Sequence, residues 1–119
     1  LRRKASGYGY LMARFIDIWI NCPDRETADK IAEEVIGARL AACANIFAQI
    51  GSHYHWKGAV EREEEVPLVL KTRTEHFDAV CETVRPLHPY DVPSIVAVEI
   101  SHIDQAYADW LRKETREPA

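Results

Sequence analysis

The sequence predicts an α+β fold, and three observations support this. Residues 13–22 alternate between two side-chain faces, as a β-strand does. Two segments with helical apolar spacing are separated by two long extended runs, residues 42–56 and 59–73. A last extended run, residues 94–101, precedes a C-terminal helix that Asp104 caps. The order β-α-β-β-α-β with two right-handed crossovers gives a ferredoxin-like sandwich, with both helices on one face of an antiparallel sheet.

The first strand and the two helices each carry a recognisable apolar stripe. One strand face is uniformly apolar and consists of Ile16, Ile18, Ile20 and Cys22. The other face carries Phe15 and Trp19, so we expect the last helix or another subunit to cover it. Asp24 is a good N-cap for the first helix, which should end near Gly37. The second helix opens at residues 74–75 and ends at Pro86.

The two long extended runs form a hairpin with its turn at Lys57-Gly58. Fifteen residues of strand reach about 50 Å, whereas a compact domain of this size is about 35 Å across. The hairpin must therefore bend at Gly51 or project and pair with another chain. Pro67 cannot donate to a ladder and predicts an edge or a bulge. The acidic run at residues 61–65 is expected to be a solvated strand edge.

Length and charge restrict the class of protein. The 119 residues fit one domain, which we place at residues 13–115. Residues 1–12 are interpreted as a flexible extension or a cloning remnant, and the charged tail from Lys113 is expected to fray. Fifteen basic against nineteen acidic residues disfavour a nucleic-acid partner. No apolar run reaches the roughly 20 residues of a membrane span. Three cysteines outside CxxC pairs favour reduced thiols in the cytoplasm.

Six sequence blocks occur in an order that resembles the CutA family of divalent-cation-tolerance proteins. The blocks are residues 22–24 (CPD), 40–46 (LAACANI), 54–58 (YHWKG), 65–72 (EVPLVLKT), 88–93 (HPYDVP) and 107–110 (YADW). The resemblance runs from about Phe15 to about Leu111. It implies a ferredoxin-like subunit, a tight homotrimer built from the long hairpins, and a role in tolerance of copper and other divalent metals.

The resemblance also indicates where a metal would bind. His88 lies in a loop fixed by two prolines, and Cys22 ends the first strand. Imidazole and thiolate ligands suit copper or zinc, and these two residues are the natural pair in the family's metal site. The alternative for Cys22 is burial, since it continues an apolar face. His53 and His55 share one strand face and are weaker metal candidates, at positions where the family usually has other residues.

A second hypothesis is a signalling or scaffold trimer resembling the nitrogen-regulatory PII proteins. In that case Lys71 and the aromatic residues Tyr54, Trp56 and Tyr90 would line a cleft between subunits and bind a small anion. The sequence has no Gly-rich phosphate loop, GxSxG elbow or HExxH helix. We therefore expect a non-enzymatic cytoplasmic homotrimer that binds copper or another divalent cation weakly, without an organic cofactor or a membrane partner.

Overall fold

The computed structural model describes residues 14–118, so the interpretation of residues 1–12 lies outside the described residues. The strands are β1 (Phe15–Cys22), β2 (Cys43–Ile46), β3 (Ile50–Trp56), β4 (Ala59–Arg73) and β5 (Ile95–Ile100). The α-helices are α2 (Arg25–Gly37), α3 (Phe77–Val84) and α4 (Gln105–Glu114), and short 3-10 turns flank α3 at Thr74–His76 and Arg85–Leu87.

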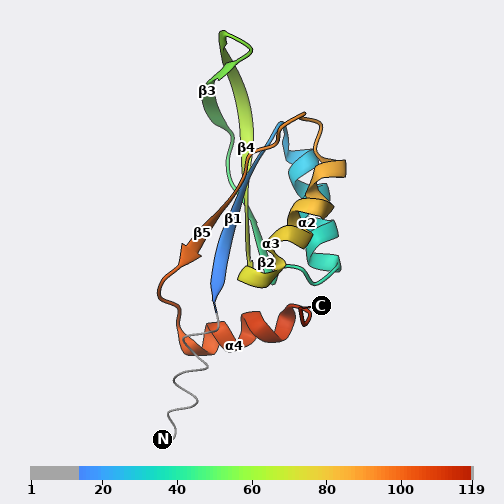
Figure 1. Ribbon diagram of the computed structural model, residues 1–119, viewed down its shortest axis with the longest axis vertical. Coiled ribbons are helices and arrows are strands. Elements are labelled where there is room, and N and C mark those ends of the chain that lie inside the picture. The colour runs from blue at the N-terminus through green and yellow to red at the C-terminus, as the bar shows by residue number, and fades with distance from the viewer. Residues whose placement is uncertain (1–13, 119) are drawn as a thin grey trace, which may run out of the picture.

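The strands form one antiparallel sheet in the order β2-β4-β1-β5, and β3 pairs with the far half of β4. Helices α2 and α3 lie together on one side of this sheet (Figure 1). Beneath them the predicted apolar stripe of β1 is buried, together with Ile31, Leu68, Leu70 and Val80. The ferredoxin-like fold is therefore confirmed.

Helices α2 and α4 begin at the predicted capping residues, Asp24 and Asp104. The Asp24 carboxylate accepts a hydrogen bond from the Thr27 backbone N–H at 2.8 Å, and α2 ends at Gly37. Asp104 accepts the Tyr107 N–H at 3.2 Å and begins α4 in the same way. Each cap satisfies a backbone donor that the first helical turn leaves free.

Strand β4 passes through two environments. From Val66 to Arg73 it pairs with β1 and is almost wholly buried, whereas from Ala59 to Glu65 it pairs with β3 and is mostly exposed. Residues 50–65, here called the hairpin arm, extend beyond the helices (Figure 1). The molecule accordingly measures 58 × 26 × 25 Å. Both turn residues, Lys57 and Gly58, have positive φ, as a two-residue hairpin turn of type I′ requires.

The extended run predicted for residues 42–56 is interrupted at residues 47–49, ahead of the bend expected at Gly51. Pro67 explains this position. Its carbonyl accepts the Phe47 N–H at 2.9 Å, so the side of Pro67 that lacks an N–H faces the interruption. The ladder between β2 and β4 cannot continue there. The proline thus marks the point at which the hairpin arm separates from the body of the sheet.

The sheet face opposite α2 and α3 is only partly covered. Helix α4 packs Ala108 and Leu111 on Phe15 at the end of the molecule opposite the arm (Figure 1). Farther along, four apolar side chains remain exposed and define the open sheet face: Trp19, Phe47, Val96 and Val98. The Trp19 and Phe47 rings pack against each other at a tilt, with centroids 5.5 Å apart. The C-terminal helix therefore leaves this face available to another subunit.

The chain beyond α4 is held against the body by Arg73, a buried residue of β4. Its Nη2 donates to the carbonyls of Arg112 at 2.7 Å and Thr115 at 3.0 Å, and its Nε donates to Thr115 Oγ1 at 2.8 Å. These bonds satisfy carbonyls that the last turn of a helix leaves without partners. Arg73 thereby fixes the position of α4.

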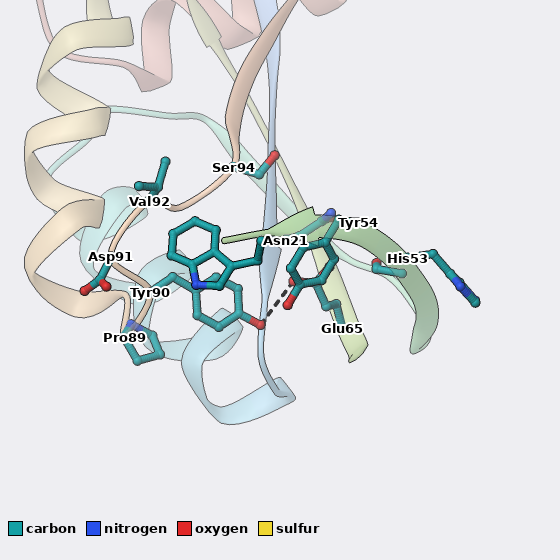
Figure 2. A pocket seen from close by; sticks show the side chains of 11 residues that line it. Asn21, His53, Tyr54, Glu65, Pro89, Tyr90, Asp91, Val92 and Ser94 are labelled. Atoms are coloured by element: carbon teal, nitrogen blue, oxygen red, sulfur yellow. Dashed lines mark hydrogen bonds between the residues drawn. The ribbon is translucent and has the colours of Figure 1, made fainter. Parts of the chain in front are cut away.

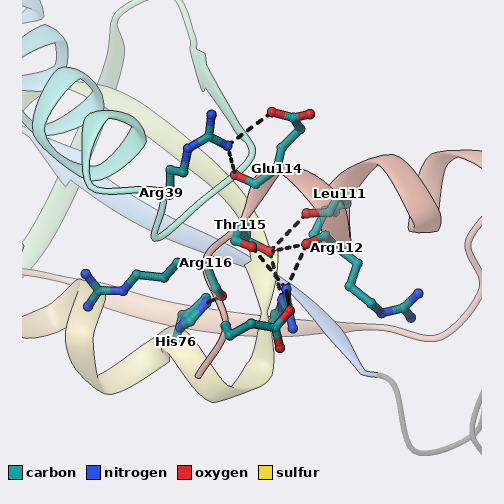
Figure 3. A network of polar contacts seen from close by, with 9 residues as sticks. Arg39, His76, Leu111, Arg112, Glu114, Thr115 and Arg116 are labelled. Carbon is teal, nitrogen blue, oxygen red and sulfur yellow. Dashed lines mark hydrogen bonds and ion pairs between the residues drawn. The ribbon is translucent and has the colours of Figure 1, made fainter. Parts of the chain in front are cut away.

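Arg116 continues this attachment past the helix (Figure 3). Its N–H donates to the Arg39 carbonyl at 2.9 Å, and its own carbonyl lies 2.7 Å from His76 Nε2. Arg39 also contacts Glu114 at 3.2 Å. The expectation that the tail frays from Lys113 is therefore wrong as far as residue 116, because its backbone is bound both to the loop after α2 and to His76.

The Arg73→Leu substitution should lower the free energy of unfolding by about 3 kcal/mol, since it leaves buried carbonyls without a donor. Arg39→Leu removes an exposed ion pair and should cost only about 0.5 kcal/mol. Urea unfolding of the two variants and the wild type at one protein concentration measures the difference. Equal losses in the two variants would contradict the anchoring role of Arg73.

Candidate functional site

A cleft of about 620 Å³ lies where the hairpin arm leaves the body of the molecule (Figure 2). Its walls come from β3, the end of β1, Glu65 of β4 and the loop after His88. The lining residues are Asn21, Ser52, His53, Tyr54, Trp56, Glu65, Pro89, Tyr90, Asp91, Val92 and Ser94. A volume of this size is typical of a small-molecule site.

Glu65 and Tyr90 form the polar centre of the cleft. The Tyr90 hydroxyl donates to Glu65 Oε2 at 3.1 Å, and the Tyr54 ring lies beside them with its hydroxyl toward the same carboxylate (Figure 2). Burial, reinforced by Glu65, raises the pKa of Tyr90 well above its ordinary value. Tyr90 is therefore a fixed hydrogen-bond donor at neutral pH. The expectation that residues 61–65 are all solvated is wrong for Glu65, which is 6% exposed.

Of the four residues expected to form an anion cleft, three meet here and one does not. Tyr54, Trp56 and Tyr90 all line the cleft. Lys71 lies elsewhere, on the side of the sheet away from α2 and α3, where its Nζ contacts Asp17 Oδ1 at 3.0 Å. The cleft is instead lined by two carboxylates, Glu65 and Asp91, and no lysine or arginine within residues 14–118 lines it. This charge disfavours the small anion of the PII-like hypothesis.

His88 is buried beneath the cleft with both ring nitrogens engaged. The Tyr90 backbone N–H donates to Nδ1 at 3.3 Å, so Nε2 carries the hydrogen and donates to the Asn21 carbonyl at 2.8 Å. The His88 and Tyr90 rings also pack edge to face, 4.7 Å apart. His88 therefore positions the loop, and in this arrangement it has no free lone pair for a metal ion.

Cys22 lies in the main core and is fully buried. Burial, with smaller effects from the charges of Asp24 and Glu65, raises the pKa of its thiol to about 12. A metal ligand must be a thiolate, and at neutral pH this side chain remains a thiol. Within residues 14–118 there is also no cluster of three or more His, Cys, Asp or Glu side chains arranged for a metal ion. The predicted pair of His88 and Cys22 does not fit a bound metal in this conformation.

His53 and His55 lie on β3, opposite Arg62 and Val60 of β4. Both are exposed, and His53 lies at the edge of the cleft. Because they are two residues apart on one strand, their imidazoles share a face. They are the accessible imidazoles of the hairpin arm.

Comparison with known proteins agrees with this architecture. The family model described as CutA1 divalent ion tolerance protein matches residues 16–114. The chain belongs to the CutA family. The CutA protein of Thermus thermophilus is 43% identical over 98 residues, covering 82% of this chain and 95% of the relative. The solved structure of Cut A1 from the same organism has a TM-score of 0.83 at 41% identity, covering 86% of this chain and 99% of that one.

Animal relatives are longer than the region that they share with this chain. Protein CutA of mouse is 37% identical over 111 residues, which are 93% of this chain but 63% of the mouse protein. The human protein is 36% identical, and 62% of its length is spanned. Among residues 14–118, no helix combines the length and apolar character needed to cross a membrane.

The raised pKa of the Cys22 thiol should make the free energy of unfolding depend on pH. Its pKa is raised from 9.0 to about 12, so above about pH 9 the unfolded chain loses a proton that the folded chain keeps. The contribution of the thiol is complete below pH 9 and is lost as pH rises toward 12. The difference in free energy of unfolding between wild type and Cys22→Ala should therefore shrink between about pH 9 and about pH 11.

Urea unfolding across this pH range measures the change. Ile20→Val removes a neighbouring buried methyl without a titrating group, so its difference from wild type should stay constant. A Cys22→Ala difference that is equally constant would show that the thiol is not perturbed.

Proposed function

We propose that this chain serves divalent-cation tolerance as a homotrimer that acts by binding and not by catalysis. The observation that carries the proposal is the hairpin arm, which extends beyond its own subunit beside an uncovered apolar face. A two-stranded ribbon is only marginally stable on its own. Pairing with sister chains would stabilise it.

The open sheet face supports the same assembly. Val96 and Val98 are 53% and 51% exposed on β5, next to Trp19. An edge strand with an apolar face favours association, and closed rotational symmetry prevents that association from continuing indefinitely. The resemblance to the CutA family implies three copies. The cysteines at 22, 43 and 81 are free, which fits a reducing compartment, and we place the trimer in the cytoplasm.

The metal contact is proposed at His53 and His55. These imidazoles are exposed on one face of β3, whereas His88 and Cys22 are occupied or buried. Two imidazoles from one strand provide borderline ligands for copper or zinc, and the remaining positions would be completed by water or by sister chains. Such a site would bind its cargo weakly, which suits tolerance better than storage.

Light scattering in dilute solution should give a mass near three times 13.6 kDa. Val98→Glu places a charge on the open sheet face and should shift the mass toward that of one chain. Ala38→Glu introduces the same charge on the helical side and should leave the mass unchanged. A single-chain mass for the wild type would contradict the assembly.

Isothermal titration with Cu(II) and Zn(II) tests the metal contact. Replacing both His53 and His55 by Asn should weaken binding by at least about 10-fold, because the imidazole ligands are lost. Cys22→Ala and His88→Gln should retain the affinity of the wild type, and His102→Asn controls for loss of a surface imidazole. If affinity for the metal is lost only in the Cys22 or His88 variant, the metal is bound by Cys22 and His88 and not by the two histidines of β3.

A further inference from the structure

The Glu65 carboxylate is buried without a compensating cation. It is 6% exposed, and its only hydrogen bond among the described residues comes from the Tyr90 hydroxyl. No ion pair within residues 14–118 involves it. Buried carboxylates in proteins are usually paired with a positive group, because transfer of a lone charge from water is costly. The environment of Glu65 is therefore complementary to a cation that enters the cleft.

Aromatic rings line the approach to this carboxylate. Tyr54, Trp56 and Tyr90 line the cleft, and the two tyrosines lie beside Glu65 (Figure 2). Indole and phenol faces attract cations, most strongly in the case of tryptophan. Lys57 already places its ammonium 5.8 Å from the centre of the Trp56 ring without lining the cleft. Asp91 adds a second acidic group to the lining.

We infer that this cleft binds a small organic cation, a protonated amine on an apolar body. The ammonium group would pair with Glu65, and the apolar body would lie against Trp56 and the two tyrosines. A small anion is disfavoured by the acidic lining. A strongly hydrated metal ion is disfavoured because Trp56, Tyr54 and Tyr90 make much of the lining aromatic, which suits an organic cation better. The inference concerns a ligand different from the metal cargo proposed above and does not depend on it.

The experiment uses three probes that share one body and differ in charge: phenethylammonium, phenethyl alcohol and phenylacetate. Each is titrated into the full chain in its native assembly, and binding is followed calorimetrically. We expect saturable binding of phenethylammonium that is about 10-fold tighter than binding of the alcohol, with phenylacetate weaker still. Equal affinities, a preference for phenylacetate or no saturable binding would overturn the inference.

Substitutions of the residues that line the cleft test whether phenethylammonium binds there. Glu65→Gln keeps an acceptor for Tyr90 but removes the charge, so it should abolish the preference for phenethylammonium over phenethyl alcohol. Trp56→Leu should weaken binding of both probes, whereas Trp110→Leu, at an exposed tryptophan outside the cleft, should change neither. If Glu65→Gln fails to fold, Asp91→Asn at an exposed position should reduce the preference. If the folded variant, Glu65→Gln or Asp91→Asn, keeps the full preference for phenethylammonium over phenethyl alcohol, the inference is overturned.

Competition with Zn(II) separates the two kinds of cation. His53 lines the edge of the cleft, so the competition is measured in the variant in which His53 and His55 are both replaced by Asn, and there Zn(II) should not displace phenethylammonium. Displacement that persists when both histidines are replaced by Asn would show that the cleft is itself a metal site and would overturn the organic-cation inference.

Discussion

The structure depends on strand β4, which serves both the core and the hairpin arm. Its buried half fills the centre of the sheet between β1 and β2, and its exposed half can pair only with β3. Fifteen extended residues span about 50 Å, so they cannot fit across a body about half that width. Pro67 sets the division, since the ladder with β2 ends where this residue lacks a donor. The elongated shape and the cleft both follow from this strand.

The cleft is a consequence of the same division. Glu65 is the last residue of the arm, and Val66 is the first buried apolar residue of the body. The Glu65 carboxylate therefore lies at the edge of the core. The loop after His88 closes the other side. The hydrogen bonds of His88 to Asn21 and Tyr90 hold that loop against the end of β1. Glu65 at this boundary and the fixed loop after His88 together form a concave surface that is both acidic and aromatic.

Most of the fold is predictable from the sequence because local signals agree with it. The alternation of β1, the Asp24 cap and the Lys57-Gly58 turn each determine an element from neighbouring residues alone. The site is less predictable, since it depends on contacts between distant segments. Nothing local shows that Glu65 is buried while Glu64 is exposed, or that Lys71 pairs with Asp17 and not with the cleft. The burial of Cys22 was foreseeable from its place on the apolar face, whereas the hydrogen bonds that occupy His88 were not.

The marginal stability of a two-stranded ribbon also has a kinetic consequence. The main core is made of β1, the buried half of β4 and helices α2 and α3, with β2 and β5 packed beside them, and no residue of 50–65 belongs to it. The ribbon closes easily through its short turn, yet it gains little by closing until a neighbour covers it. In the trimer proposed above, the body would fold first and the ribbon would become ordered when subunits meet. Maturation of the protein would then be limited by collision between chains and would slow on dilution.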